Sequence, residues 1–221
     1  MEDILFYSLD ELPFVFIALA IAFTVHEFAH AAVAYWFGDD TAKLEGRVTL
    51  DPRKHLDVLG TVLVLLAGFG WAKPVPVNRS RFRNPRLMGA AVTFAGPLSN
   101  FLLCALGVLG YLLLQKFGVL ESADSGVSMA LITFFMIFIN LNLTLFLFNL
   151  LPLAPLDGFR IVQDLAPRSL EDGLNKFEPY SYAILFLLFV VPPVRDAVLG
   201  PLYAWGGWLL ARVYDFYFLF L

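Results

Sequence analysis

Charged residues are scarce in this sequence: aspartate, glutamate, lysine and arginine make up only 15% of its 221 residues, whereas soluble domains carry about 25%. Hydrophobic residues make up 59%, and the mean hydropathy is +0.75. This composition excludes an ordinary soluble domain and predicts an integral membrane protein that lies in the lipid bilayer. Because the apolar runs are continuous and lack the alternation of a barrel strand, helices are predicted to span the membrane.

Cysteine and basic character are also lacking. The single cysteine, Cys104, cannot form an intrachain disulfide or a cysteine-type zinc site, so we expect it to pack in the core. A net charge of −4, with no basic domain or stacking motif beside it, gives no indication of nucleic acid, and we expect no nucleic-acid partner. The N-terminal segment lacks the positive region of a cleaved signal peptide, since its charged residues are Glu2, Asp3, Asp10 and Glu11. With no internal repeat or linker, residues 1–221 are predicted to form one polytopic membrane domain.

Four apolar segments are long enough to cross a bilayer, for which roughly 20 residues suffice; they cover residues 12–37, 87–114, 128–151 and 197–221. Two others, 58–71 and 180–194, are near or below that length. We therefore predict an all-α helical bundle of four to six transmembrane segments. After the first span we expect an irregular polar stretch, with a short strand allowed around residues 47–50, and a re-entrant segment at 58–71.

Basic residues predict the orientation in the membrane. Five of them lie between residues 72 and 86 with no acidic residue among them, namely Lys73, Arg79, Arg81, Arg83 and Arg86. Because cytoplasmic loops are enriched in lysine and arginine, this loop is predicted to be cytoplasmic and the loop 115–126 external. The acidic N-terminus is then external if segment 58–71 re-enters, and cytoplasmic if that segment spans.

The ionisable residues of the first apolar segment all fall within five positions: His26, Glu27 and His30. On a helix, residues four apart share a face, so both imidazoles can bind one cation. Glu27, about 100° round the helix from His26, can reach a water molecule on that cation. The pattern predicts a zinc site with a general base inside the membrane. A chance motif on an exposed helix is the alternative, but burying three ionisable groups in lipid costs about 2.5–3.5 kcal/mol each.

A catalytic zinc usually takes three protein ligands and keeps one position for water, so a third ligand must come from elsewhere in the chain. His55 is a possible accessory ligand, but its charged neighbours favour a surface histidine at the membrane interface. Asp157 is the better candidate, because Pro152 and Pro155 break the preceding helix. The turn at Asp157-Gly158 can then direct a carboxylate towards the bundle interior. A plain helix-ending turn is the alternative for this residue.

The chain resembles the site-2 protease family of intramembrane zinc metalloproteases. The resemblance rests on motifs in the family's order: His26-Glu27-x-x-His30, then Ala95-Gly96-Pro97-Leu98-Ser99-Asn100, then Asn149-x-x-Pro152 leading to Asp157-Gly158. It implies that His26, His30 and Asp157 bind one zinc per chain, that Glu27 is the base, and that Asn149 contacts the substrate or the oxyanion. Residues 46–52 and 71–77 resemble a compact prokaryotic branch, and no PDZ or CBS domain is visible.

Other polar residues in the spans have plainer expected roles. Asn140 and Asn142 lie in the same apolar segment as Asn149, and interhelical hydrogen bonding is the expected role of both. The same bonding is an alternative for Asn149. Ser99 and Asn100, beside Gly96-Pro97, are expected to serve close helix packing.

Together these patterns predict an intramembrane zinc endopeptidase that hydrolyses a peptide bond within or next to the transmembrane helix of another membrane protein. It would be a multi-pass protein of a prokaryotic cell membrane, with its site in the cytoplasmic half. Two alternatives stay open: a zinc-binding scaffold or regulator without protease activity, and a metal transporter. A transporter needs no base at Glu27 and would favour related halves, which the sequence lacks.

Overall fold

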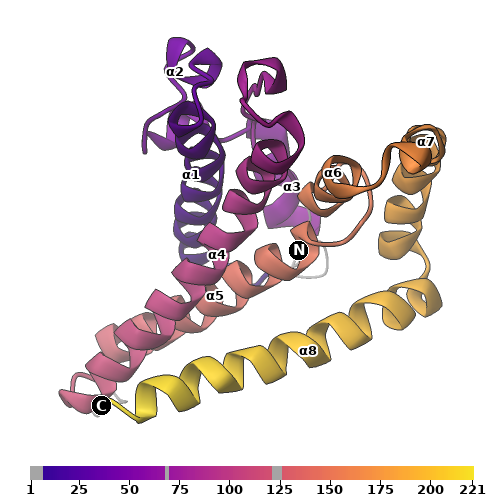
Figure 1. The fold of residues 1–221 in the computed structure, drawn as a ribbon. Coiled ribbons are helices and arrows are strands. Elements are labelled where there is room, and N and C mark those ends of the chain that lie inside the picture. Colours follow the sequence, from indigo (N-terminus) through magenta and orange to yellow (C-terminus); the bar gives the residue numbers. More distant parts are fainter. Residues whose placement is uncertain (1–6, 68–69, 121–125) are drawn as a thin grey trace.

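The computed structural model describes residues 7–67, 70–120 and 126–221, and it is predominantly helical (Figure 1). In chain order the elements are α1 (Leu12–Trp36), α2 (Thr41–Leu44), the 3-10 turn η2 (Pro52–Lys54), α3 (Val58–Ala67), the 3-10 turn η3 (Arg79–Arg81), α4 (Pro85–Lys116), α5 (Gly126–Asn149), α6 (Asp157–Leu165), α7 (Arg168–Val190) and α8 (Pro192–Phe218). The described residues form no strand, only an isolated β-bridge. The all-α prediction is therefore confirmed.

Three long helices, α1, α4 and α5, pack against one another (Figure 1). The start of α4 follows from its sequence, because Pro85 fits the first helical position and the Asn84 side chain caps the helix by accepting from the Leu87 backbone N–H. Farther along, α4 and α5 bury a cluster that includes Cys104 and Leu147. Cys104 is fully buried, as predicted. Since lipid tails are as apolar as these side chains, close packing is what favours helix association here.

Helices α1, α4 and α5 are each long and apolar enough to cross a membrane. Helices α7 and α8 meet this test only as a pair bent by 95°, so the described residues contain three spans, or up to four. This count is close to the predicted range of four to six and reaches its lower end only if the bent pair is one span. The predicted span 197–221 differs, because the glycine, proline, tryptophan and tyrosine residues of α8 leave it too weakly apolar to qualify alone.

The segment that begins with α3 returns to its starting point. Helix α3 has 10 residues, or about 15 Å of helix, half the thickness of a hydrocarbon core of about 30 Å. Leu56, just before the helix, forms an antiparallel bridge with Ala72. Glycine permits this close return, since a Cβ on Gly60 would lie 2.1 Å from the Trp71 carbonyl oxygen. The two ends of the segment therefore meet, as the re-entry predicted for residues 58–71 requires, although residues 68 and 69 of that segment lie outside the described residues.

The short strand allowed around residues 47–50 does not form. These residues are irregular, and the Arg47 side chain turns inward, where it is buried and donates to the carbonyl oxygens of Lys73 and Pro74. The Thr49 carbonyl oxygen is bonded by the ring of His55. Side chains therefore satisfy backbone groups that a strand would have paired with another strand.

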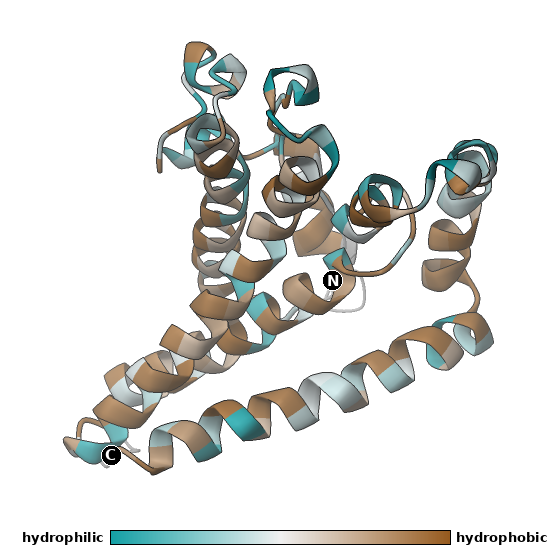
Figure 2. Ribbon diagram, viewed as in Figure 1, coloured by the Kyte–Doolittle hydropathy of each residue, from teal (hydrophilic) through white to brown (hydrophobic). Residues whose placement is uncertain are grey.

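Hydrophilic residues gather at one end of the molecule (Figure 2). They occur on α2, on the segment before α4, on α6 and at the start of α7, whereas the long helices are mostly apolar (Figure 2). Helix α1 ends at this polar end, at Trp36. The basic loop 72–86 lies between α3 and α4 on the same side.

Candidate metal centre

Helix α1 presents two histidines on one face. His26 and His30 lie about one turn apart, and only 7% and 8% of their surfaces are exposed. Their Nε2 atoms are 3.1 Å apart, and the rings meet edge to face with centroids 4.7 Å apart. The four-residue spacing thus brings two imidazole nitrogens to the same point, as predicted.

Asp157 reaches this point from a distant part of the sequence. Helix α5 ends at Asn149, and Asp157 is the first residue of α6. Gly158 lets the turn pack against the end of α5, because a Cβ there would lie 2.3 Å from the Leu150 carbonyl oxygen. As a result, Asp157 Oδ2 lies 3.1 Å from His26 Nε2 and 3.4 Å from His30 Nε2.

These three atoms fit a zinc ion. All lie within 4.8 Å of one another, and neighbouring ligands of a tetrahedral zinc with bonds of about 2.0–2.1 Å are about 3.3 Å apart. Apart from the two ring nitrogens, the buried Asp157 Oδ2 meets no hydrogen-bond donor among the described residues. Buried polar atoms are normally satisfied, so an atom left in this state suits a cation. Two imidazoles and one carboxylate also leave a fourth position open, as catalytic zinc sites do.

Helix α4 holds the other ring nitrogen of each histidine. His26 Nδ1 lies 2.7 Å from Asn100 Oδ1, and His30 Nδ1 lies 2.8 Å from the Val92 carbonyl oxygen. Both oxygens can only accept, so each Nδ1 donates and each Nε2 keeps its lone pair for a metal. Asn100, expected to serve helix packing, thus also holds a histidine of the metal centre. The sequence did offer one signal for this role, because Asn100 is a polar side chain inside an apolar span. Its partner could not be read from the sequence, since it depends on how α1 packs on α4.

Helix α4 also passes very close to both histidines at Gly96. A Cβ added there would lie 2.3 Å from His30 Nε2 and 2.7 Å from His26 Nε2. Pro97 follows within the helix, and the Ser99 hydroxyl donates to the Gly96 carbonyl oxygen over 2.7 Å. The missing side chain of Gly96 leaves room for an ion beside the histidine nitrogens.

Glu27 is buried and contacts the segment that precedes α4. Its Oε2 accepts from the Val75 backbone N–H over 3.0 Å. This segment is held on both sides of Val75, because Arg47 bonds the carbonyl oxygens before it and the Asn78 backbone N–H donates to Asp39 after it. Burial would raise the pKa of Asp39, but hydrogen bonds from Thr41 and Asn78 outweigh it and hold that pKa below its ordinary value.

The remaining candidates make separate contacts. Asn149 donates from its side chain to the Leu145 carbonyl oxygen of its own helix over 3.0 Å, and its contact with a substrate stays a prediction. His55 is fully buried and lies outside the three-residue cluster. The prediction of a surface histidine is wrong, because the ring turns inward and bonds the Thr49 carbonyl oxygen over 2.7 Å. Burial lowers the pKa of His55, which favours the neutral ring.

Two arginines anchor the far end of α6. Arg79 donates to Asp164 Oδ2 over 2.8 Å, and Arg86 Nε donates to the Asp164 carbonyl oxygen over 2.8 Å. Burial raises the pKa of Asp164 and outweighs the opposing effect of Arg79. Because α6 begins with Asp157, these contacts also hold the helix that carries the third candidate ligand.

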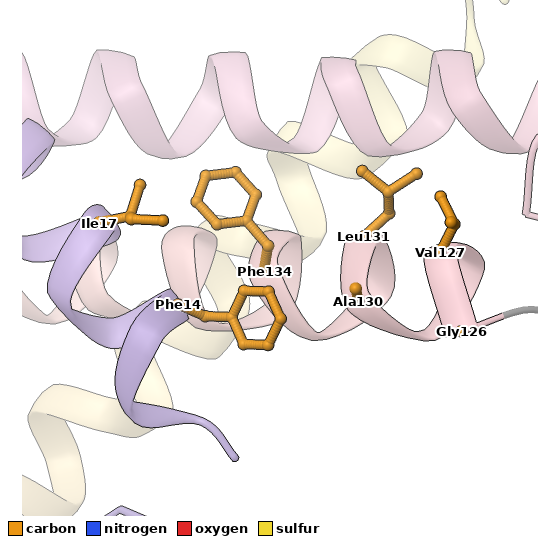
Figure 3. Close-up of a pocket in the computed structure, with 7 residues that line it drawn as sticks. All are labelled: Phe14, Ile17, Gly126, Val127, Ala130, Leu131 and Phe134. Atoms are coloured by element: carbon orange, nitrogen blue, oxygen red, sulfur yellow. The ribbon is translucent and has the colours of Figure 1, made fainter. Parts of the chain in front are cut away.

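Two hollows lie apart from the metal centre. A groove of about 390 Å³ between α1 and α5 is lined only by apolar residues, including Phe14, Ile17 and Phe134 (Figure 3). A second hollow of about 330 Å³ is lined mainly by polar residues of α6, α7 and η3, Arg79 and Asp164 among them. Neither is lined by the two histidines of α1 or by Asp157.

Comparison with known proteins identifies the family. The model of peptidase family M50 matches residues 14–192, a range that includes all three residues of the cluster. The chain belongs to peptidase family M50. Over 202 residues it is 50% identical to "Putative zinc metalloprotease YwhC" of Bacillus subtilis (strain 168), covering 91% of each chain.

More distant members are also similar. "Putative zinc metalloprotease Rip2" of Mycobacterium tuberculosis (strain H37Rv) is 26% identical over 215 residues, which cover 90% of this chain and 79% of the mycobacterial one. Rip2 of Mycolicibacterium smegmatis is 26% identical over 176 residues, 77% and 64% of the two chains. No solved structure matches the chain.

As a member of family M50, this protein is a zinc metalloprotease, and its apolar helices make it a multi-pass membrane protein. The predicted resemblance to the site-2 proteases is confirmed at this level.

Proposed function

We propose that this M50 protein is an intramembrane zinc endopeptidase that cleaves within or next to the transmembrane helix of a membrane-protein substrate. The observation that carries the proposal is the convergence of His26 Nε2, His30 Nε2 and Asp157 Oδ2, with both histidines on the membrane-spanning α1. These three atoms would hold one zinc ion per chain. Zinc bound there would lower the pKa of a water molecule towards 7 and would polarise the scissile carbonyl.

Glu27 is the proposed general base. It takes a proton from the attacking water and later gives it to the leaving amine. The Val75 N–H bonds only one carboxylate oxygen, Oε2. This bond fixes the orientation of the carboxylate, and Oε1 is the atom that accepts the proton.

Asn149 is proposed to donate to the substrate backbone or to the developing oxyanion. Its bond to the Leu145 carbonyl oxygen uses one of the two N–H groups of the side-chain amide. The second N–H can therefore serve the substrate. Loss of one such donor typically lowers kcat about 10²–10³-fold.

The site is proposed to lie in the cytoplasmic half of the membrane. His26 is ten residues from Trp36, the last residue of α1, or about 15 Å along the helix. That end of α1 is the polar end of the molecule (Figure 2) and carries the basic loop 72–86. A substrate helix must unwind near this depth, because its amides are otherwise bonded within the helix.

The test is cleavage of a model transmembrane substrate in detergent by the wild type and by Glu27→Gln, with the zinc content of both measured. Glu27→Gln should keep about one zinc per chain and lose at least 10²-fold in rate, since general base catalysis contributes about 10²–10⁴-fold. Glu11→Gln makes the same chemical change beside the start of the same helix and should cleave at the wild-type rate.

Two results would contradict the proposal. Absence of zinc from the wild type would overturn the assignment of the metal centre. Zinc in both proteins, with no cleavage by either across several substrates, would instead support a role as a zinc-binding scaffold. Equal cleavage by both proteins would overturn only the role of Glu27 as the base.

A further inference from the structure

A line of hydrogen bonds connects the metal centre to α5, a helix that carries none of the candidate ligands. From His26 Nδ1 it runs to Asn100 Oδ1 over 2.7 Å, and from Asn100 Nδ2 to Asn142 Oδ1 over 3.1 Å. Asn142 Nδ2 then donates to the Phe138 carbonyl oxygen over 2.9 Å. Asn100 and Asn142 are both fully buried.

The direction of every bond in this line follows from its last atom. A backbone carbonyl oxygen can only accept, so the Asn142 amide must turn its NH₂ group to Phe138 and its oxygen to Asn100. Asn100 must then present its NH₂ group to Asn142 and its oxygen to His26. His26 must therefore carry its ring proton on Nδ1, which leaves the lone pair on Nε2, the atom that faces Asp157.

We infer that Asn142 is a positioning residue of the metal centre, which acts through Asn100 to select the metal-binding tautomer of His26. The inference rests on the proposed zinc site. Without Asn142, the one acceptor that the described residues leave to the Asn100 NH₂ group is the Ala22 carbonyl oxygen, at a longer distance of 3.4 Å. The amide can then rotate and offer N–H to His26, which favours the tautomer with the proton on Nε2.

The test compares Asn142→Leu with Asn140→Leu in the full chain. Asn140 lies on the same helix and makes the same kind of bond to its own backbone, from Nδ2 to the Met136 carbonyl oxygen over 2.8 Å. It is exposed and serves as the matched control. Zinc affinity is measured by competition with a chelator. Asn142→Leu should bind zinc about tenfold more weakly, the lower end of the 10–100-fold range for such outer groups, while Asn140→Leu should equal the wild type.

A second measurement reads the tautomer directly. The chain has only three histidines, so ¹⁵N NMR can follow each ring. Because the Asp157 carboxylate lies 3.1 Å from His26 Nε2 and would draw a proton to it when no metal is bound, both proteins are compared metal-free, at alkaline pH and in an Asp157→Ala background. The His26 ring should carry its proton on Nδ1 in the wild type and become a mixture of tautomers in Asn142→Leu. His30, bonded to Val92, and His55, bonded to Thr49, should not change. Asn142→Asp keeps an oxygen that accepts from Asn100 and should restore both the tautomer and zinc affinity.

Each outcome separates this inference from the proposed function. Equal zinc affinity and an unchanged His26 tautomer in Asn142→Leu would overturn the inference while leaving the zinc site intact. A wild type that binds no zinc would overturn both. If Asn142→Leu does not fold, weak zinc binding or an altered His26 tautomer in a folded Asn142→Asp would contradict the inference.

Discussion

Gly96 is the residue of α4 that faces both histidine nitrogens, and its lack of a side chain has a direct consequence. A methyl group there would lie 2.3 Å from His30 Nε2 and 2.7 Å from His26 Nε2, closer than van der Waals contact allows. It would compete for the space in which a metal ion must sit. The glycine is therefore a requirement of the centre rather than of the helix, in which alanine is the better residue by about 1 kcal/mol.

Gly96→Ala should accordingly lose zinc while keeping its fold. We expect zinc affinity to fall at least tenfold, with helical content by circular dichroism unchanged. Gly207→Ala is the control, since that glycine lies in α8 with nothing within 4 Å of the added methyl group. Wild-type zinc affinity in Gly96→Ala would show that the centre has more room than the structure indicates.

Sequence alone could predict residues whose geometry is local. His26 and His30 share one helix face, so their spacing was sufficient. Asp157 could be proposed because a third ligand was needed and the prolines mark the end of the helix before it. The partners of the ring nitrogens, Asn100 and Val92, could not be predicted. They lie 74 and 62 residues after their histidines, and their contacts depend on how α4 packs against α1.

At the scale of elements, α1, α4 and α5 were predictable within a few residues, whereas α7 begins at Arg168, well before the predicted segment 180–194. Runs of apolar residues fixed α1, α4 and α5. The return of the chain after α3 was predictable, because the apolar segment 58–71 is too short to span easily. The absence of a strand at residues 47–50 was not predictable. That outcome depends on Arg47, whose side chain bonds carbonyl oxygens 26 and 27 residues away.

The re-entry of α3 can be tested by labelling. Lys54 and Lys73 are exposed and lie on either side of the segment. In a Cys104→Ala background, Lys54→Cys and Lys73→Cys should react with a membrane-impermeant maleimide from the same side, because the segment returns to its start. Gln115→Cys, at the far end of the spanning α4, should react from the opposite side. Labelling of Lys54→Cys and Lys73→Cys from opposite sides would mean that the segment crosses the membrane.

At the scale of the whole molecule, the metal centre joins α1 directly to α6, two helices that otherwise meet mainly through α4. His26 and His30 belong to α1, whereas Asp157 begins α6, more than 120 residues later. A ligand that binds only the folded state stabilises it by about 2.7 kcal/mol at a hundred times its Kd. Zinc should therefore contribute to the stability of the bundle as well as to its chemistry.

Removal of zinc with a chelator should lower the melting temperature of the wild type by roughly 5–10 °C, since 1 kcal/mol corresponds to about 2–4 °C in a protein of this size. The measurement is a thermal scan in detergent at fixed protein and zinc concentrations. Asp157→Ala, which removes one candidate ligand, should melt at the same temperature with and without the chelator. A wild type that is equally indifferent to chelation would argue against a metal link between α1 and α6.

The Val75 contact with Glu27 also constrains how the chain can lie against α1. The residues on either side of Val75 are Pro74 and Pro76, and proline has no backbone N–H. If the segment slid by one residue in either direction, a proline nitrogen would face the carboxylate and the bond to Glu27 would be lost. The proline–valine–proline run therefore excludes a slip of one residue in either direction, so the covalent chain itself helps to set which amide meets Glu27.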